Sequence, residues 1–231
     1  MESNLLKDTM FDPNSEIHKR MMASLPDHIE EPPKEKPKPT LQEFWRGSDV
    51  PTRFRRDTYS LSQFGQWNDK LNALKDKLKT EPGMICVLRG PRGTGKTQLA
   101  VELLKHAACE LGLSTLFTSA RDIQLITTSS FKDKEVTDMS VLQEFIKPKV
   151  LLIDEFDWQP LDKAHYFNSN LFYLLDKRYA WCRSTILTSN ATVEEFNSRV
   201  DPGILSRMTE SGGRIDCDNW ANQRIQRRIK N

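Results

Sequence analysis

The stretch VLRGPRGTGKTQLA, residues 87–100, decides the fold. Within it, Gly90, Gly95, Lys96 and Thr97 match the pattern G-x-x-x-x-G-K-[ST], directly after an apolar run and directly before a helical pattern. Glycines let the backbone wrap close to phosphate with its amide N–H groups pointing inward, and the start of the following helix adds a favourable dipole. The stretch therefore predicts a strand, a phosphate-binding loop and a helix, with a nucleoside triphosphate as the ligand.

The loop assigns chemical tasks to its side chains. Lys96 is expected to reach the terminal phosphates, and the hydroxyl of Thr97 is expected to ligate Mg²⁺. ATP and Mg²⁺ are therefore the predicted cofactors. The residues of the loop predicted to bind the nucleotide are Gly90, Pro91, Arg92, Gly93, Thr94, Gly95, Lys96, Thr97 and Gln98.

A second apolar run, VLLIDEFD at residues 150–157, ends in two acids. It predicts a buried strand whose end presents Asp154, placed to hold the water shell of Mg²⁺, and Glu155, placed as the general base for an attacking water. Alternatively, the run is a strand that simply ends in two solvated acids. The phosphate-binding loop upstream favours the catalytic interpretation, and a carboxylate base favours hydrolysis over transfer to a small molecule.

Short apolar runs and helical patterns alternate from residue 84 onward. This alternation favours a parallel sheet covered by helices on both faces, so we predict an α/β P-loop NTPase with a five-stranded parallel sheet. Thr192 and Glu195 are spaced as a capping box that begins a short helix. The expected strands are MICVL (84–88), TLFT (115–118), VLLID (150–154), TILTS (185–189) and RIDC (214–217).

Composition limits the class of protein. Charged residues make up 29% of the 231 residues and apolar residues 37%, and the net charge of +2 argues neither for nor against nucleic acid. The four cysteines are scattered without a C-x-x-C pair, so a zinc site is not expected. No run approaches the ~18 apolar residues of a membrane span, and the first residues are polar, so we expect a cytoplasmic protein with no membrane partner.

Changes in composition divide the chain into three parts. Residues 1–40 form a short N-terminal extension, a candidate partner-binding segment that ends in the Pro- and Lys-rich linker EEPPKEKPKPT. Residues 41–83 include an apolar stripe at helical spacing, which predicts lead-in helices that pack on the main domain. Residues 84–231 are the predicted ATPase domain. The stripe consists of Trp67, Leu71, Leu74 and Leu78.

Two further residues are candidates for the chemistry. TILTSN ends in Asn190, whose side chain could reach the attacking water or the γ-phosphate, or could be an ordinary Asn in the turn after a strand. Arg207, in DPGILSRMTESGG, could neutralise transition-state charge on the nucleotide of a neighbouring subunit, or could be a solvated surface arginine. The residues alone leave both questions open.

The order of GPRGTGKT, VLLIDE, LLDKRYAWCRSTILTSN and ILSRM resembles that in the AAA+ ATPases of the DnaC/DnaI helicase-loader and IstB-like group. The resemblance runs from about residue 84 to the end of the chain, with a weaker likeness in VPTRFRRDTYSLSQF. It implies Walker A roles for Lys96 and Thr97 and Walker B roles for Asp154 and Glu155. It also implies an AAA+ fold.

The resemblance carries over to three more positions. It implies that Asn190 is the sensor-1 residue and that Arg207 is an arginine finger acting across an ATP-bridged interface between copies of the chain. It further implies that Arg224, in NWANQR, is a sensor-2-like contact to the nucleotide. Too little chain follows the expected fifth strand for the usual C-terminal helical lid, and the lack of that lid is typical of this branch.

The leading hypothesis is an ATPase that loads a hexameric replicative DNA helicase onto single-stranded DNA. Hydrolysis would release the helicase. The DNA contacts are predicted in SSFKDK, where Phe131 offers a stacking face and Lys132 and Lys134 offer phosphate contacts, although the same segment could be an ordinary polar loop. Two alternatives are an IstB-like accessory ATPase for a transposase, which has nearly the same core, and a nucleotide-sensing adaptor with negligible turnover.

Overall fold

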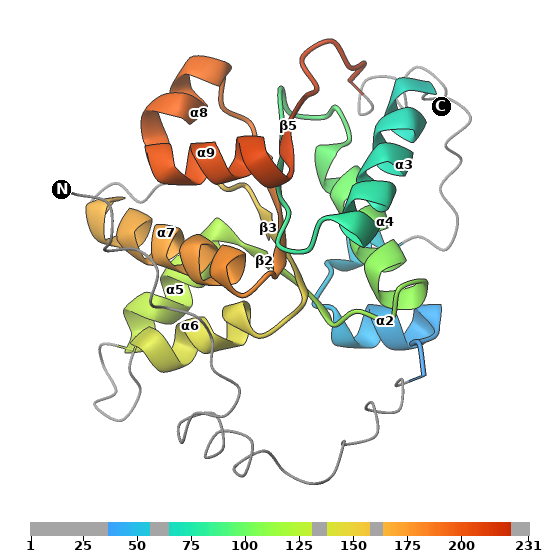
Figure 1. Cartoon of the computed structure of the whole chain (residues 1–231), viewed down its shortest axis with the longest axis horizontal. Helices are drawn as coiled ribbons and strands as arrows, with labels where there is room; N and C mark the ends of the chain where they lie inside the picture. The colour runs from blue at the N-terminus through green and yellow to red at the C-terminus, as the bar shows by residue number, and fades with distance from the viewer. Residues whose placement is uncertain (1–36, 56–64, 131–137, 158–163, 223–231) are drawn as a thin grey trace, which may run out of the picture. The chain divides into compact units, whose positions relative to one another are not determined.

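A computed structural model describes residues 37–55, 65–130, 138–157 and 164–222 (Figure 1). The chain divides into two compact units, Met1–Lys36 and Pro37–Asn231, and all of the described residues belong to the second. None of the described helices is long and apolar enough to cross a membrane.

The centre of the second unit is a five-stranded sheet with the strand order β2-β3-β4-β1-β5 and parallel pairing throughout. Strands β1, β3 and β4 are almost completely buried, as expected of parallel strands that are covered on both faces. The predicted α/β fold is therefore confirmed, and each predicted strand is present with ends shifted by at most one residue. The strands are β1 (Ile85–Arg89), β2 (Thr115–Ser119), β3 (Val150–Asp154), β4 (Ser184–Ser189) and β5 (Gly213–Asp216).

Helices cover the two faces of the sheet and form two apolar cores (Figure 1). Alternate residues of β1 face opposite cores: Cys86 and Leu88 join the first, Ile85 and Val87 the second. The first core contains α2 (Leu41–Gly47), α3 (Gly65–Thr80) and α4 (Lys96–Cys109), and the short 3-10 helix η1 (Thr52–Phe54) packs against it. The second contains α5 (Ala120–Ser130), α6 (Asp138–Ile146), α7 (Ala164–Ala180), α8 (Val193–Arg199) and α9 (Pro202–Ser211).

Local sequence signals account for several helix ends. The Thr192 hydroxyl accepts from the Glu195 N–H at 3.2 Å, and the Glu195 carboxylate accepts from the Thr192 N–H at 2.9 Å, so the predicted capping box is confirmed at the start of α8. Thr40 and Glu43 form a second capping box at the start of α2. The stripe predicted in residues 41–83 lies in α3 and is buried in the core shared with α4. Among the described residues after β5, at 217–222, there is no helix.

A buried arginine joins α7 to the ends of α6 and β4. Arg178 is 0% exposed, and its guanidinium donates to the Thr185 hydroxyl at 2.9 Å. Burial lowers the pKa of Arg178 to about 9, so the side chain stays charged at neutral pH. Its other donors satisfy the carbonyls at the end of α6, which have no partner within the helix. The acceptors at and just after the end of α6 are the carbonyl oxygens of Phe145, Ile146 and Pro148. A fourth acceptor is the carbonyl oxygen of Ser184, the first residue of β4.

Replacing Arg178 by methionine is expected to lower the free energy of unfolding by about 3 kcal/mol or more, because buried carbonyls lose their donor. Urea denaturation followed by circular dichroism would measure the change. Arg121→Met, on an exposed position of α5, serves as the control and is expected to change stability little. Equal stability of the two variants would show that the buried guanidinium is not needed to join the helices.

Candidate nucleotide site

The phosphate-binding loop follows β1, and α4 begins directly after it at Lys96. Lys96 is 6% exposed, and its ammonium donates to the carbonyl oxygens of Gly90 and Pro91, each at 2.7 Å, and to the Asn190 Oδ1 at 3.1 Å. β1 and β4 are neighbours in the sheet, with Arg89 opposite Ser189, so the residues that follow the two strands meet. The structure thus brings together the predicted Walker A lysine and the predicted sensor-1 asparagine.

The second half of the site lies at the end of β3. The Thr97 hydroxyl donates to Asp154 Oδ1 at 2.9 Å, and the Thr188 hydroxyl donates to the same oxygen at 2.5 Å. The register of β3 and β4 explains the second contact, since Ile153 lies opposite Leu187 and the next pair along is Asp154 and Thr188. The two side chains predicted to hold Mg²⁺ are therefore one hydrogen bond apart.

This donor set fits a magnesium ion held together with phosphate. Mg²⁺ in nucleotide sites binds one or two protein oxygens, while phosphates and water complete its shell. A hydroxyl and a carboxylate are oxygens of this kind, and they lie beside the phosphate-binding loop. Within the described ranges, no three His, Cys, Asp or Glu side chains gather to form a metal site of their own.

Glu155 lies at a sharp bend directly after β3. Its φ of 51° is in the left-handed region, which is uncommon for residues other than glycine and recurs at functional sites. The Glu155 N–H donates to the Thr188 hydroxyl at 3.0 Å, and the Glu155 side chain is exposed. Two residues on, the Asp157 carboxylate accepts from the Asn190 N–H at 2.8 Å. The segment after β3 is thus hydrogen-bonded to β4 at Glu155 itself and to the residue after β4 two positions further on.

Thr188 is a residue of this site that the sequence did not indicate. It is 2% exposed, it donates to Asp154, and it accepts from the backbone of Glu155. In the sequence it is one residue of an apolar run, and the only signal was a hydroxyl inside a strand otherwise suited to burial. The contact depends on β4 lying beside β3, although β4 follows β3 only after a long helical segment.

Thr188→Val keeps the shape of the side chain and removes the hydroxyl. ATP turnover is expected to fall about tenfold, because Asp154 loses a donor and the Glu155 N–H loses its acceptor. The affinity for ATP is expected to change little. Phosphate release at saturating ATP and a binding titration would measure the two quantities, with Thr115→Val, at the start of the sheet strand β2, as the control. Unchanged turnover in Thr188→Val would show that the Thr188 hydroxyl has no role in ATP hydrolysis.

Arg207 lies away from the phosphate-binding loop of its own chain. Its guanidinium forms an ion pair with Asp176 of α7 at 2.7 Å and lies over the Tyr179 ring at 5.3 Å, and its side chain is 32% exposed. One turn later, Ser211 accepts from the N–H of Ile85, at the start of β1, whereas the loop follows the end of β1. Arg207 is therefore at the opposite edge of the sheet from Lys96, and its expected role at the nucleotide of a neighbouring subunit stays a prediction.

The remaining predicted site residues fall outside the described part of the chain. These are Arg224 and the candidate DNA contacts Phe131, Lys132 and Lys134. The structure neither places them nor tests their roles, so they stay predictions.

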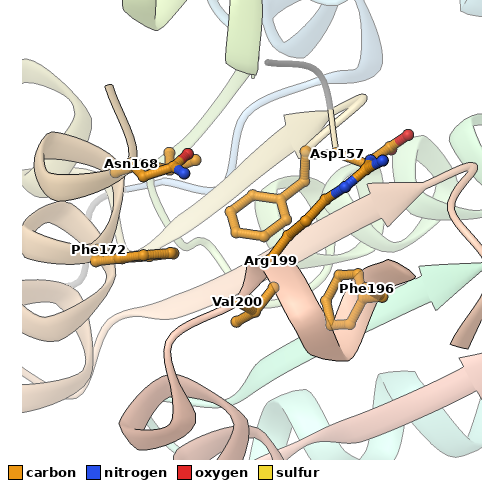
Figure 2. Close-up of a pocket in the computed structure, with 8 residues that line it drawn as sticks. Asp157, Asn168, Phe172, Phe196, Arg199 and Val200 are labelled. Carbon is orange, nitrogen blue, oxygen red and sulfur yellow. The ribbon is translucent and has the colours of Figure 1, made fainter. Parts of the chain in front are cut away.

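A small pocket lies beside the loop that follows β3 (Figure 2). The Phe156 and Phe196 rings lie 6.1 Å apart there and connect the segment after Glu155 to α8. Its lining is largely apolar and does not include the phosphate-binding loop, so it is distinct from the candidate nucleotide site. The lining residues are Phe156, Asp157, Asn168, Leu171, Phe172, Phe196, Arg199 and Val200.

The sheet, the phosphate-binding loop and the paired acids define a P-loop NTPase of the AAA+ class. Residues 63–210 match the family model described as IstB-like ATP binding protein, and the chain belongs to this family.

Known relatives include proteins of insertion sequences and of replication. The chain is 36% identical over 119 residues to the ATP-binding protein of insertion sequence IS5376 from Geobacillus stearothermophilus, a match that covers 51% of this chain and 44% of that protein. It is 24% identical over 170 residues to the replicative helicase loader DnaC of Escherichia coli K12, which covers 73% of this chain and 68% of the loader. The match to the insertion-sequence protein thus spans less than half of that relative's length.

Solved structures show the same fold. A crystal structure of the DnaC helicase loader superimposes with a TM-score of 0.57 and 22% identity, covering 75% of this chain and 97% of that one. At this identity the likeness concerns the fold alone. The expected AAA+ fold and the expected family are confirmed.

Proposed function

We propose that this protein is an ATPase that loads a hexameric replicative helicase onto single-stranded DNA, with ATP binding and hydrolysis switching assembly and release. The observation that carries the ATPase part is the hydrogen bond of 2.9 Å between Thr97 and Asp154, beside a buried Lys96 and an exposed Glu155. These are the groups that hydrolysis of a triphosphate requires, and they converge at the end of the sheet.

Each side chain has a task in this proposal. Lys96 exchanges its loop carbonyl acceptors for oxygens of the terminal phosphates. Thr97 and Asp154 hold Mg²⁺, Asp154 through water, and the bound ion neutralises charge on the phosphates. Glu155 accepts a proton from the attacking water, and Asn190, already bonded to Lys96, orients that water or the γ-phosphate.

The assignment to helicase loading is supported by the extent of the match to DnaC. That match spans 170 residues and about two thirds of the loader, whereas the match to the IS5376 protein spans 119 residues. The identity of 36% to the IS5376 protein favours a second candidate, an accessory ATPase for transposition on duplex DNA. The ATPase core serves either function, so the difference lies in the partner and in the DNA.

Co-purification with the replicative helicase of the host, in ATP and in ADP, tests the proposal. A complex that forms in ATP and dissociates after hydrolysis is expected, and Lys96→Ala, which removes the phosphate contact, is expected to abolish its nucleotide dependence. The second arm measures binding to single-stranded and duplex DNA. Failure to bind the helicase in either nucleotide, together with a preference for duplex DNA, would exclude loading and favour the transposition function.

The proposed DNA contacts are tested in the same assay. Phe131→Ala and the double change of Lys132 and Lys134 to Ala are expected to weaken single-stranded DNA binding, since stacking and phosphate contacts are lost. Binding of the helicase is expected to persist in both variants. Unchanged DNA affinity would assign the contacts to another part of the assembly.

A further inference from the structure

The segment after β5 passes directly over the phosphate-binding loop. We call residues 217–222 the C-terminal strap. A Cβ atom on Gly90 would lie 2.9 Å from the carbonyl carbon of Cys217, and one on Gly93 would lie 2.5 Å from the Asn222 Oδ1. The contact at Gly90 is with backbone, so a side chain there would require the strap to shift, whereas the contact at Gly93 is with the end of the Asn222 side chain. The strap therefore lies against the loop at both glycines.

A buried arginine fastens the strap to the base of the loop. Arg89 is the last residue of β1, directly before the loop, and it is 2% exposed. It pairs with Asp216 at 2.8 Å and makes a short ion pair with Asp218, while its backbone carbonyl accepts from the Cys217 N–H at 2.6 Å. Burial acts to lower the pKa of Arg89, but hydrogen bonds and charges of Asp218 and Asp216 outweigh burial and raise the pKa above its usual value.

The same arginine also reaches the segment after β4. It donates to the Ala191 carbonyl at 3.0 Å, one residue beyond Asn190. Arg89 lies directly before the loop, and its guanidinium therefore connects the loop to the segment that carries Asn190 and to the strap. An arginine suits this position because its planar group offers several donors in fixed directions.

The far end of the strap contacts the middle of the loop. The Asn222 side-chain amide donates to the Arg92 carbonyl at 3.3 Å. In a trans peptide the carbonyl of one residue and the N–H of the next point in opposite directions. The contact to Arg92 therefore fixes the direction of the Gly93 N–H, one of the groups that a phosphate-binding loop uses.

We propose that the C-terminal strap holds the phosphate-binding loop in the shape that binds ATP, with Arg89 and Asp218 as its anchor and Asn222 as the positioning residue at its tip. This inference rests on the proposed nucleotide site and is independent of helicase loading.

The test uses the full chain and two strap variants, Asp218→Ala and Asn222→Ala. Arg214→Met is the matched control, because Arg214 pairs with the same Asp216 at 3.1 Å and no contact from its side chain to the phosphate-binding loop is present among the described residues. Titration with a fluorescent, non-hydrolysable ATP analogue gives the dissociation constant, and phosphate release at saturating ATP gives the turnover. Thermal melting without nucleotide reports any damage to the fold.

Each strap variant is expected to raise the dissociation constant about fivefold, since a hydrogen bond that orients the loop is lost. Turnover at saturating ATP is expected to stay within about twofold, because neither residue touches the reacting atoms. Arg214→Met is expected to leave both quantities unchanged. A loss confined to affinity, without a matching loss of melting temperature, would support positioning over simple stabilisation.

Unchanged dissociation constants in both strap variants would overturn the inference, as would an equal effect of Arg214→Met. If the wild-type chain binds ATP but not the helicase, the proposal of helicase loading is rejected. The role of the strap is then still decided by the ATP titrations of the strap variants. If the wild-type chain binds no ATP, both the proposed function and the proposed role of the strap are rejected.

Discussion

Glu155→Gln is expected to lower ATP turnover by about 100-fold or more, while the affinity for ATP changes by less than about twofold. General base catalysis contributes on the order of 10²–10⁴ to rates, and an amide of the same shape cannot accept the proton. The Thr188 contact holds the Glu155 backbone rather than its carboxylate, so the substitution leaves the local structure intact. The variant is thus expected to accumulate in the ATP-bound state.

Phosphate release, measured with and without single-stranded DNA, gives the turnover. Glu144→Gln, an exposed glutamate of α6, is the control for loss of a charge and is expected to behave as wild type. Equal turnover in Glu155→Gln and wild type would assign the base to another residue. Equal and undetectable rates in all three proteins would favour a nucleotide-sensing adaptor over an ATPase.

The order and type of the elements around the loop could be read from the sequence because local patterns determine them. An apolar run followed by G-x-x-x-x-G-K-[ST] specifies a strand, a loop and a helix within fourteen consecutive residues, 87–100. The capping box at Thr192 and Glu195 is equally local. The chemistry of Lys96 and Thr97 follows from the loop itself. Thr97 and Asp154 are both predicted to hold Mg²⁺, and the structure adds that the two side chains are hydrogen-bonded to each other.

Contacts that join distant parts of the chain could not be read in this way. Arg89 stands in the sequence as the last residue of an apolar strand, and its partners Asp216 and Asp218 come more than a hundred residues later. Their meeting requires β5 to add beside β1, which no local pattern fixes. From the sequence, Arg178 is expected to be an exposed arginine near the end of a helix, although the structure buries it fully. Buried charges are rare enough that sequence reasoning assigns them to the surface by default.

The helix α5 shows a different limit. Its sequence, ARDIQLITTSS, mixes β-branched residues with polar ones, and such residues have only modest helix propensity. Packing decides the outcome, because Ile123 and Thr127, one turn apart, are both buried. Tertiary burial therefore forms a helix that propensity alone does not predict.

Arg207→Ala is expected to lower turnover by about 1,000-fold if the arginine completes the site of a neighbouring subunit, the size of effect typical of arginine fingers. The position of Arg207 supports this role, since it lies at the opposite edge of the sheet from the loop of its own chain. The ATP affinity of the isolated variant is expected to be unchanged. The same measurement of phosphate release applies, at protein concentrations that favour assembly.

Mixing two inactive variants tests directly whether the arginine acts between subunits. Glu155→Gln keeps the arginine and loses the base, whereas Arg207→Ala keeps the base and loses the arginine. In a random equimolar head-to-tail assembly, about one interface in four joins an intact base to an intact arginine, so turnover is expected to recover to at least ~10% of wild type.

Asp176→Asn separates catalysis from the ion pair within the chain. If Arg207 matters only through its bond of 2.7 Å to Asp176, this variant should lose as much turnover as Arg207→Ala, and mixing should restore nothing. If the arginine acts on a neighbouring nucleotide, Asp176→Asn keeps the cation and is expected to retain most of the activity, because an exposed ion pair of this kind is worth only about 0.2–1 kcal/mol. Recovery on mixing, with an active Asp176→Asn protein, would place the ATPase chemistry at the junction of two chains.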